Sequence, residues 1–213
     1  MKKSKLGTSV IESMIVMLII TIGVVGAYNI YVNSMRVSES TSYKVEAISM
    51  AREGIEALTN IRDTNWMIYR ANTTNCWNTY NYKGSCITAD GTFGSEWTNI
   101  PSGSYILYNL DNRWILSGAT TGTYSSSGYR NDFRVKKDSL GFYTQDYLTG
   151  TNFFPTFTRE IKISYPPDAY PLGAGTPPQK MNVESIVRWS DAGRRSGNYE
   201  VKLDTLLTNW IKD

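Results

Sequence analysis

The chain has 213 residues, with 22 lysines and arginines against 19 acidic residues and no histidine. Three of the lysines, Lys2, Lys3 and Lys5, lie at the N-terminus, so the remainder is balanced in charge and lacks the basic excess typical of nucleic-acid-binding proteins. Without histidine, and without a nucleophile elbow, a phosphate-binding glycine loop or a metal motif, we predict no enzymatic activity, no cofactor and no metal site. A pair of distant carboxylates brought together as in a glycosidase stays an alternative.

A long apolar segment follows the basic N-terminal residues. No acidic or basic side chain occurs from Ser13 to Met35, and this length lets a helix cross a bilayer. Glu12 is the single charged residue between Leu6 and Arg36. A carboxylate in such a segment costs about 2–4 kcal/mol and usually marks a partner or a pathway, so we expect Glu12 to pair with a cation.

The order of these features differs from that of a secretory signal peptide, in which the cut follows the apolar core. Here the basic residues are followed by Leu6-Gly7, and a cut after Gly7 would keep the apolar segment and expose the amine of Thr8. That amine would lie about one helical turn from Glu12. The N-terminal lysines predict a cytoplasmic N-terminus, with the chain beyond about Val32 outside the membrane.

The stretch Lys5-Leu6-Gly7 and Thr8-Ser9-Val10-Ile11-Glu12-Ser13, followed by the apolar helix, resembles the class III leader of type IV prepilins and type II secretion pseudopilins. The resemblance implies cleavage after Gly7 by a prepilin peptidase, commonly followed by N-methylation of the new first residue. It also implies that Glu12 meets the Thr8 amine of a neighbouring subunit during assembly. Thr8 stands where the family usually has phenylalanine, and the helix lacks the proline that many major pilins carry.

The resemblance further implies an α+β, pilin-like lollipop. Its expected parts are a leader over 1–7, a long helix over 8–66 whose segment 10–32 crosses the membrane, and an extracytoplasmic head with an antiparallel β-sheet over 67–213. The expected function is that of a structural subunit, a pilin, minor pilin or pseudopilin, of a type IV pilus-like filament. Its partners would be other pilin subunits, the prepilin peptidase and N-methyltransferase, and an inner-membrane assembly platform.

The implied location is a single pass through the cell membrane before assembly and a cell-surface filament afterwards. The alternative is a single-pass membrane-anchored adhesin or ligand-binding module that does not polymerise. In that case Glu12 is a tolerated polar residue near the cytoplasmic end of the anchor.

Beyond the apolar segment, hydrophobic residues recur at spacings of three and four, which predicts that the helix continues with one apolar face. We expect this face to pack on a sheet of the same chain; it comprises Val37, Thr41, Val45, Ile48, Ala51, Ile55, Leu58 and Ile61. The charged face opposite is then available to neighbouring subunits. The residues Arg62-Asp63-Thr64-Asn65 are typical of a helix end.

Two cysteines, Cys76 and Cys86, lie in a polar, aromatic stretch of the outer part. An even count in an extracytoplasmic segment predicts a disulfide. Two free thiols or a metal pair are the alternatives, although a tetrahedral zinc site would need carboxylates for half of its ligands.

The remainder is predicted to form β-strands joined by turns. Residues 104–108 and 113–116 suggest a hairpin, and 157–165 alternates, with Arg159, Ile161, Ile163 and Tyr165 on one face. Residues 183–189 and 199–205 predict a terminal antiparallel hairpin, which also resembles the last strands of minor pilins. Two stretches rich in glycine, serine or proline, 117–128 and 165–178, are expected to be surface loops.

Aromatic residues near cations offer a second function, because exposed rings can stack on sugars or on bases of single-stranded DNA. Core packing explains most of these residues without a ligand, so glycan or nucleic-acid binding stays unproven. The candidates are Trp77, Tyr80, Tyr82, Trp97, Trp114, Tyr124, Tyr129, Tyr143 and Tyr147.

Overall fold

The structure is a computed structural model of the whole chain. It describes the backbone of residues 6–82, 86, 99–119, 124, 126–146, 150–152, 156–170, 177–190 and 198–210. Side chains are described from Val10 onward, apart from Ala71. Residues 1–5 of the predicted leader, and the candidate aromatics Trp97 and Tyr147, lie outside the described part.

One helix, α1 (Leu6–Ile68), dominates the N-terminal part of the chain. The chain forms two compact units that divide between Val45 and Glu46, within this helix. The helix ends two residues beyond the expected Trp66, because the main-chain N–H of Tyr69 still donates to the carbonyl of Asn65 at 2.8 Å. Trp66 and Tyr69, both buried, fix this last turn within the second unit: the indole N–H of Trp66 donates to Asn209, and the hydroxyl of Tyr69 donates to the carbonyl of Tyr82.

Short helices follow α1 and connect the strands. They are η1 (Arg70–Asn72), α2 (Thr73–Cys76), η2 (Tyr80–Tyr82), α3 (Ser127–Asp132) and η4 (Pro167–Ala169). The hydroxyl of Ser126 accepts from the N–H of Tyr129 and caps the start of α3. The serine-rich stretch before it therefore ends in a defined helix.

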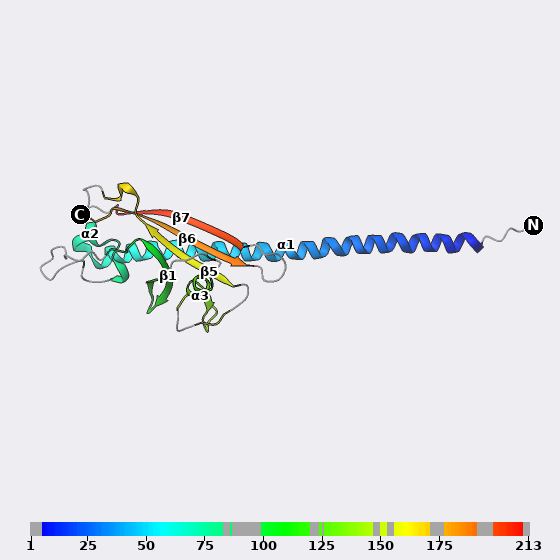
Figure 1. The fold of residues 1–213 in the computed structure, drawn as a ribbon, viewed down its shortest axis with the longest axis horizontal. Helices are drawn as coiled ribbons and strands as arrows, with labels where there is room; N and C mark the ends of the chain where they lie inside the picture. Colours follow the sequence, from blue (N-terminus) through cyan, green and yellow to red (C-terminus); the bar gives the residue numbers. More distant parts are fainter. Residues whose placement is uncertain are drawn as a thin grey trace, which may run out of the picture. The chain divides into compact units, whose positions relative to one another are not determined.

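The second unit is built on a five-stranded antiparallel sheet in the order β2-β1-β5-β6-β7 (Figure 1). Its strands are β1 (Gly103–Leu110), β2 (Arg113–Gly118), β5 (Phe157–Ser164), β6 (Lys180–Ser190) and β7 (Asn198–Thr208). A second, two-stranded sheet pairs β3 (Lys136–Lys137) with β4 (Tyr143–Thr144).

Both predicted hairpins are confirmed. Strands β1 and β2 are joined by Asp111 and Asn112, whose φ angles of +51° and +62° are those of a type I′ turn. Strands β6 and β7 pair over eleven positions, with Val187 opposite Val201 and Trp189 opposite Tyr199. The sheet thus forms where alternating sequences and turn residues predict it.

The C-terminal part of α1, from Glu46, packs on one face of this sheet (Figure 1). Gly54 permits the close approach, because a Cβ atom built there would lie 2.8 Å from Cδ1 of Ile161 and would also collide with the hydroxyl of Ser185. The hydrophobic core lies between the helix and the strands. It includes Ala57, Leu58, Ile61, Tyr105, Leu107, Ile163, Met181 and Val183. A helix packed on an antiparallel sheet confirms the α+β class.

The buried face of α1 differs from the predicted one. Ala51, Leu58 and Ile61 are buried as expected, but Val37 and Val45 are exposed. Ala47, Met50, Gly54 and Ala57 take part in the buried face instead. The reason is that the close approach of helix and sheet favours small residues. Alanine and glycine give little signal in a pattern of large apolar side chains, so the hydrophobic spacing did not predict them.

One predicted surface loop is partly buried. In the stretch 165–178, Ala169 is fully buried and the carbonyl of Pro178 accepts from the indole N–H of Trp77 at 2.8 Å. A buried tryptophan needs a partner for its N–H, and this carbonyl supplies it. Residues 171–176 of this stretch lie outside the described part.

Candidate functional site

The first unit of the structure contains an apolar helical segment, from Val10 to Met35, that is exposed on every side. Each side chain from Val10 to Ile30 is exposed, and the large apolar ones keep between 49% and 72% of their accessible surface. A helix that is apolar all round is normally enclosed by protein or by lipid. By length and composition α1 can cross a membrane: its most apolar 18-residue window has a mean hydropathy of 2.4.

Polar side chains within this apolar part are satisfied locally. The hydroxyl of Ser13 donates to the carbonyl of Val10 at 2.9 Å, and that of Thr21 donates to the carbonyl of Leu18 at 2.8 Å. Such bonds back to the preceding turn let hydroxyl groups enter an apolar environment without a further partner. Glu12 has no such option, because a carboxylate accepts hydrogen bonds and cannot donate to its own helix.

The predicted processing and assembly residues all lie at the start of α1. Gly7 and Thr8 fall in its first turn, and Glu12 is exposed about one turn later. The side chains of the first two lie outside the described part, so pairing between the Thr8 amine and Glu12 stays a prediction. What the structure shows is Glu12 as the one charged side chain among the described residues 10–35 of α1, most of which are apolar and exposed.

The predicted disulfide between Cys76 and Cys86 is present, and both residues are fully buried. It ties the end of α2 to a segment ten residues further along the chain. Closing a loop of this length contributes about 2.5–3 kcal/mol in the chain-entropy model. Nearby, the side-chain amide of Asn65 donates to the carbonyls of Trp77 and Thr79 and attaches this segment to α1.

A fully buried arginine, Arg159 on β5, connects the sheet to α1. Its Nη2 donates to the carbonyl of Leu107, and its Nε donates to Oε1 of Gln145, each at 2.9 Å. Its Nη1 forms an ion pair with Glu53 on α1 at 3.2 Å, without hydrogen-bond geometry. Burial lowers the pKa of Arg159, and Glu53 opposes that change, so the guanidinium keeps its charge.

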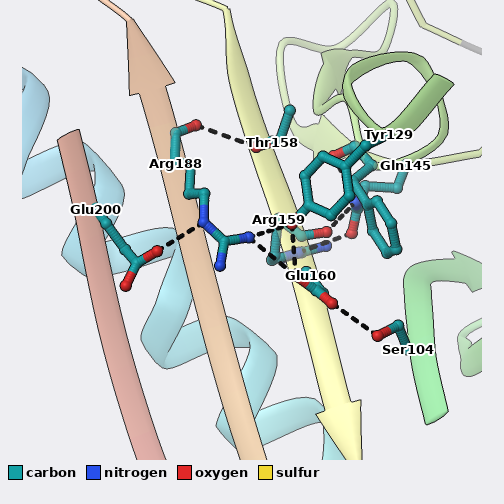
Figure 2. Close-up of polar contacts among 9 residues, drawn as sticks. Ser104, Tyr129, Gln145, Thr158, Arg159, Glu160, Arg188 and Glu200 are labelled. Carbon is teal, nitrogen blue, oxygen red and sulfur yellow. Dashed lines mark hydrogen bonds and ion pairs between the residues drawn. The ribbon is translucent and has the colours of Figure 1, made fainter. Parts of the chain in front are cut away.

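A second charged cluster lies on the opposite face of the sheet and is centred on Glu160 (Figure 2). The carboxylate of Glu160 accepts from the hydroxyls of Ser104 at 2.6 Å and Tyr129 at 2.5 Å, and it forms an ion pair with Arg188 at 2.9 Å. Arg188 also pairs with Glu200 on the edge strand at 2.6 Å. Burial alone would raise the pKa of Glu160, but these three donors hold it below its ordinary value.

Burial raises the pKa of Tyr129, and its hydrogen bond to Glu160 adds to the effect. The phenol is therefore a permanent donor at neutral pH. Together these bonds link β1, β5, β6, β7 and α3 (Figure 2). Every charge in the cluster is paired with another member, so we interpret it as structural.

Most of the described aromatic candidates belong to the core. Trp77 is fully buried, Tyr129 is buried, and Tyr80, Tyr82 and Trp114 pack against the main core cluster. Tyr143 donates to Glu46 on α1 and stacks beneath Lys137. Tyr124 differs from these residues because it lines a pocket that Arg130 also lines.

Comparisons with models of protein families, with curated proteins and with solved structures find no match to this chain. Within the described residues, no group of three or more cysteine and acidic side chains is placed to hold a metal ion.

Proposed function

We propose that the chain is a structural subunit, a pilin, minor pilin or pseudopilin, of a type IV pilus-like filament. In this proposal it is cleaved after Gly7, waits in the membrane as a single-pass protein, and assembles through its N-terminal helix. The prepilin peptidase and N-methyltransferase, an assembly platform and other pilin subunits are its partners.

The observation that carries this proposal is the exposed apolar surface of α1, with Glu12 as its one charge. Lipid would solvate the apolar residues, but an unpaired carboxylate in lipid costs about 2–4 kcal/mol. A neighbouring subunit that brings a free amine would satisfy both, because a buried charge is tolerated once it is paired. The resemblance of the residues around Gly7 to a prepilin leader supplies that amine at Thr8.

The paired charges of the second unit are consistent with a stable head outside the membrane. The disulfide Cys76–Cys86 fits an oxidising extracytoplasmic compartment. A membrane-anchored adhesin or binding module that does not polymerise would share the helix, the disulfide and the head. It gives no role to Glu12, so this residue distinguishes the two functions.

The test replaces Glu12 by alanine in a host that makes the filament. Glu12→Ala should enter the membrane at least as well as the native chain, because it removes a charge from an apolar helix. Its amount in filaments sheared off the cell surface should fall by at least about tenfold, because an unpaired Thr8 amine would be buried in the filament. Quantitative blotting of the membrane and sheared fractions measures both.

Glu12→Asp is the matched control, since it keeps the charge and shortens the side chain by one methylene group. We expect it to recover part of the incorporation. If Glu12→Ala reaches the sheared filaments in native amounts, assembly does not depend on this carboxylate and the anchored binding module is the better account.

A further inference from the structure

A polar pocket of about 320 Å³ lies in the second unit, between α3 and the ends of β5 and β6. Two arginines line it, Arg130 on α3 and Arg134 in the segment that follows. The other polar residues of its lining are Ser127, Asn131, Thr156, Thr158 and Ser190. We propose that this pocket binds an acidic sugar, with its carboxylate between Arg130 and Arg134.

The fold brings the two arginines into one pocket. The main-chain N–H of Val135 donates to the carbonyl of Phe157 at 2.9 Å, and that of Arg159 donates to the carbonyl of Phe133 at 2.9 Å. These bonds pair Arg134 with Thr158 as in an antiparallel sheet, so the side chains of Arg134 and Thr158 lie on the same face of the sheet. That is the face away from α1, since Thr158 alternates with the helix-facing Arg159.

The charge of this pocket is not compensated by the residues that the structure describes. No acidic residue occurs among its described lining, and neither Arg130 nor Arg134 takes part in the ion pairs of the described chain. The Nε of Arg134 is buried and donates to no described acceptor. This contrasts with Arg159 and Arg188, whose charges are both paired. Two guanidinium groups that line one pocket without an acidic partner favour an anionic ligand, which would pair with both charges.

The remaining lining favours a sugar over a bare anion. Hydroxyl and amide groups, which both donate and accept hydrogen bonds, surround the arginines and match the hydroxyl groups of a saccharide. Tyr124 adds an aromatic ring, which meets that of Tyr129 edge-on at 6.2 Å. The volume is at the low end for small-molecule sites, which suits a single sugar ring.

The test is a titration of the full-length protein in detergent with glucuronate, galacturonate and N-acetylneuraminate. Calorimetry or NMR measures the binding of each sugar. Glucose serves as the uncharged probe and inorganic phosphate as the bare anion. We expect at least one acidic sugar to bind about tenfold more tightly than glucose and than phosphate, because only it uses both the arginines and the hydroxyl groups.

Arg134→Gln and Arg130→Gln should each weaken that binding by about tenfold, since each removes a charge-assisted hydrogen bond. Ser127→Glu tests the site without altering either arginine. The new carboxylate, at an exposed position of α3, should repel the acidic sugar and weaken its binding by a similar factor. Arg52→Gln, the same change at an exposed position of α1 outside the pocket, should bind as the native protein does. A thermal melt of each variant establishes that it is folded.

Three results would overturn the proposal. The first is no binding of any acidic sugar at millimolar concentration. The second is binding that persists in folded Arg134→Gln and Ser127→Glu proteins. The third is equal affinity for phosphate and the acidic sugars, which would identify a general anion site.

Discussion

At the residue scale, Glu160 shows how the head of this protein holds its charges. The carboxylate receives three donors from β1, α3 and β6, and its pKa lies below its ordinary value as a result. A carboxyl group with a depressed folded pKa stabilises the fold above its unfolded pKa of about 4.3. That contribution is lost as the pH falls through the folded pKa.

We therefore expect Glu160→Gln to reduce the free energy of unfolding at pH 7 by about 1–3 kcal/mol. The difference from the native protein should begin to shrink as the pH falls below the unfolded pKa of about 4.3, and it should go on shrinking until the folded carboxyl group is protonated too. Urea unfolding of both proteins at pH 7, 5 and 3.5 measures this difference.

Glu56→Gln is the matched control, because Glu56 is an exposed carboxylate on α1 and should change stability little at any pH. A difference between native protein and Glu160→Gln that stays constant from pH 7 to pH 3.5 would mean that the charge of Glu160 contributes nothing.

At the element scale, the contact between α1 and the sheet depends on small residues. Ala47, Ala51, Gly54 and Ala57 lie on the buried face of the helix, and Gly54 meets Ile161 and Ser185 most closely. Larger side chains would push the helix away from the strands and would disturb the ion pair between Glu53 and Arg159.

Gly54→Ala should therefore destabilise the protein. The added methyl group collides with two fully buried side chains at a cost of about 1–3 kcal/mol, offset by up to about 1 kcal/mol from the better helix propensity of alanine. A thermal melt monitored by circular dichroism should show a lower Tm.

Gly128→Ala is the control, because a Cβ atom there has nothing within 4 Å among the described atoms. It should leave the Tm unchanged or raise it. A Tm for Gly54→Ala equal to or above that of the native protein would show that the helix does not pack as tightly as described.

The elements themselves were predictable where local signals are strong. The apolar run and its amphipathic continuation predict α1, and the sequence Asp111-Asn112 between two alternating segments predicts the first hairpin. Gly54 and the pocket between Arg130 and Arg134 were not predictable. Both depend on which strand lies opposite which helix, and single-sequence patterns carry no information on such long-range contacts.

Arg159 is an intermediate case. Alternation placed it correctly on the face of Ile161 and Ile163, which is buried. Its complete burial was not expected, because a charged residue is rarely buried without a partner. The partners, Glu53 and Gln145, lie 106 and 14 residues away along the chain and show no spacing that links them to it.

At the scale of the whole molecule, the chain combines an exposed apolar helical segment with a head, the second unit from Glu46 onward, whose described core, disulfide and ion pairs are its own. The head needs no partner to bury its core, whereas the apolar part of α1 needs lipid or protein around it. This division fits a subunit that assembles through its helix and presents its head outward. The proposed sugar pocket belongs to the second unit and lies outside the apolar segment through which we propose that the chain assembles.

The most direct test of this account is the mass of the mature protein, isolated from a host that has its own prepilin peptidase, together with its N-terminal peptide. The account predicts a chain that begins at Thr8, with or without an added methyl group, and that keeps the apolar helix. A chain that retains the leader Met1–Gly7, or one cut beyond the apolar segment, would contradict it.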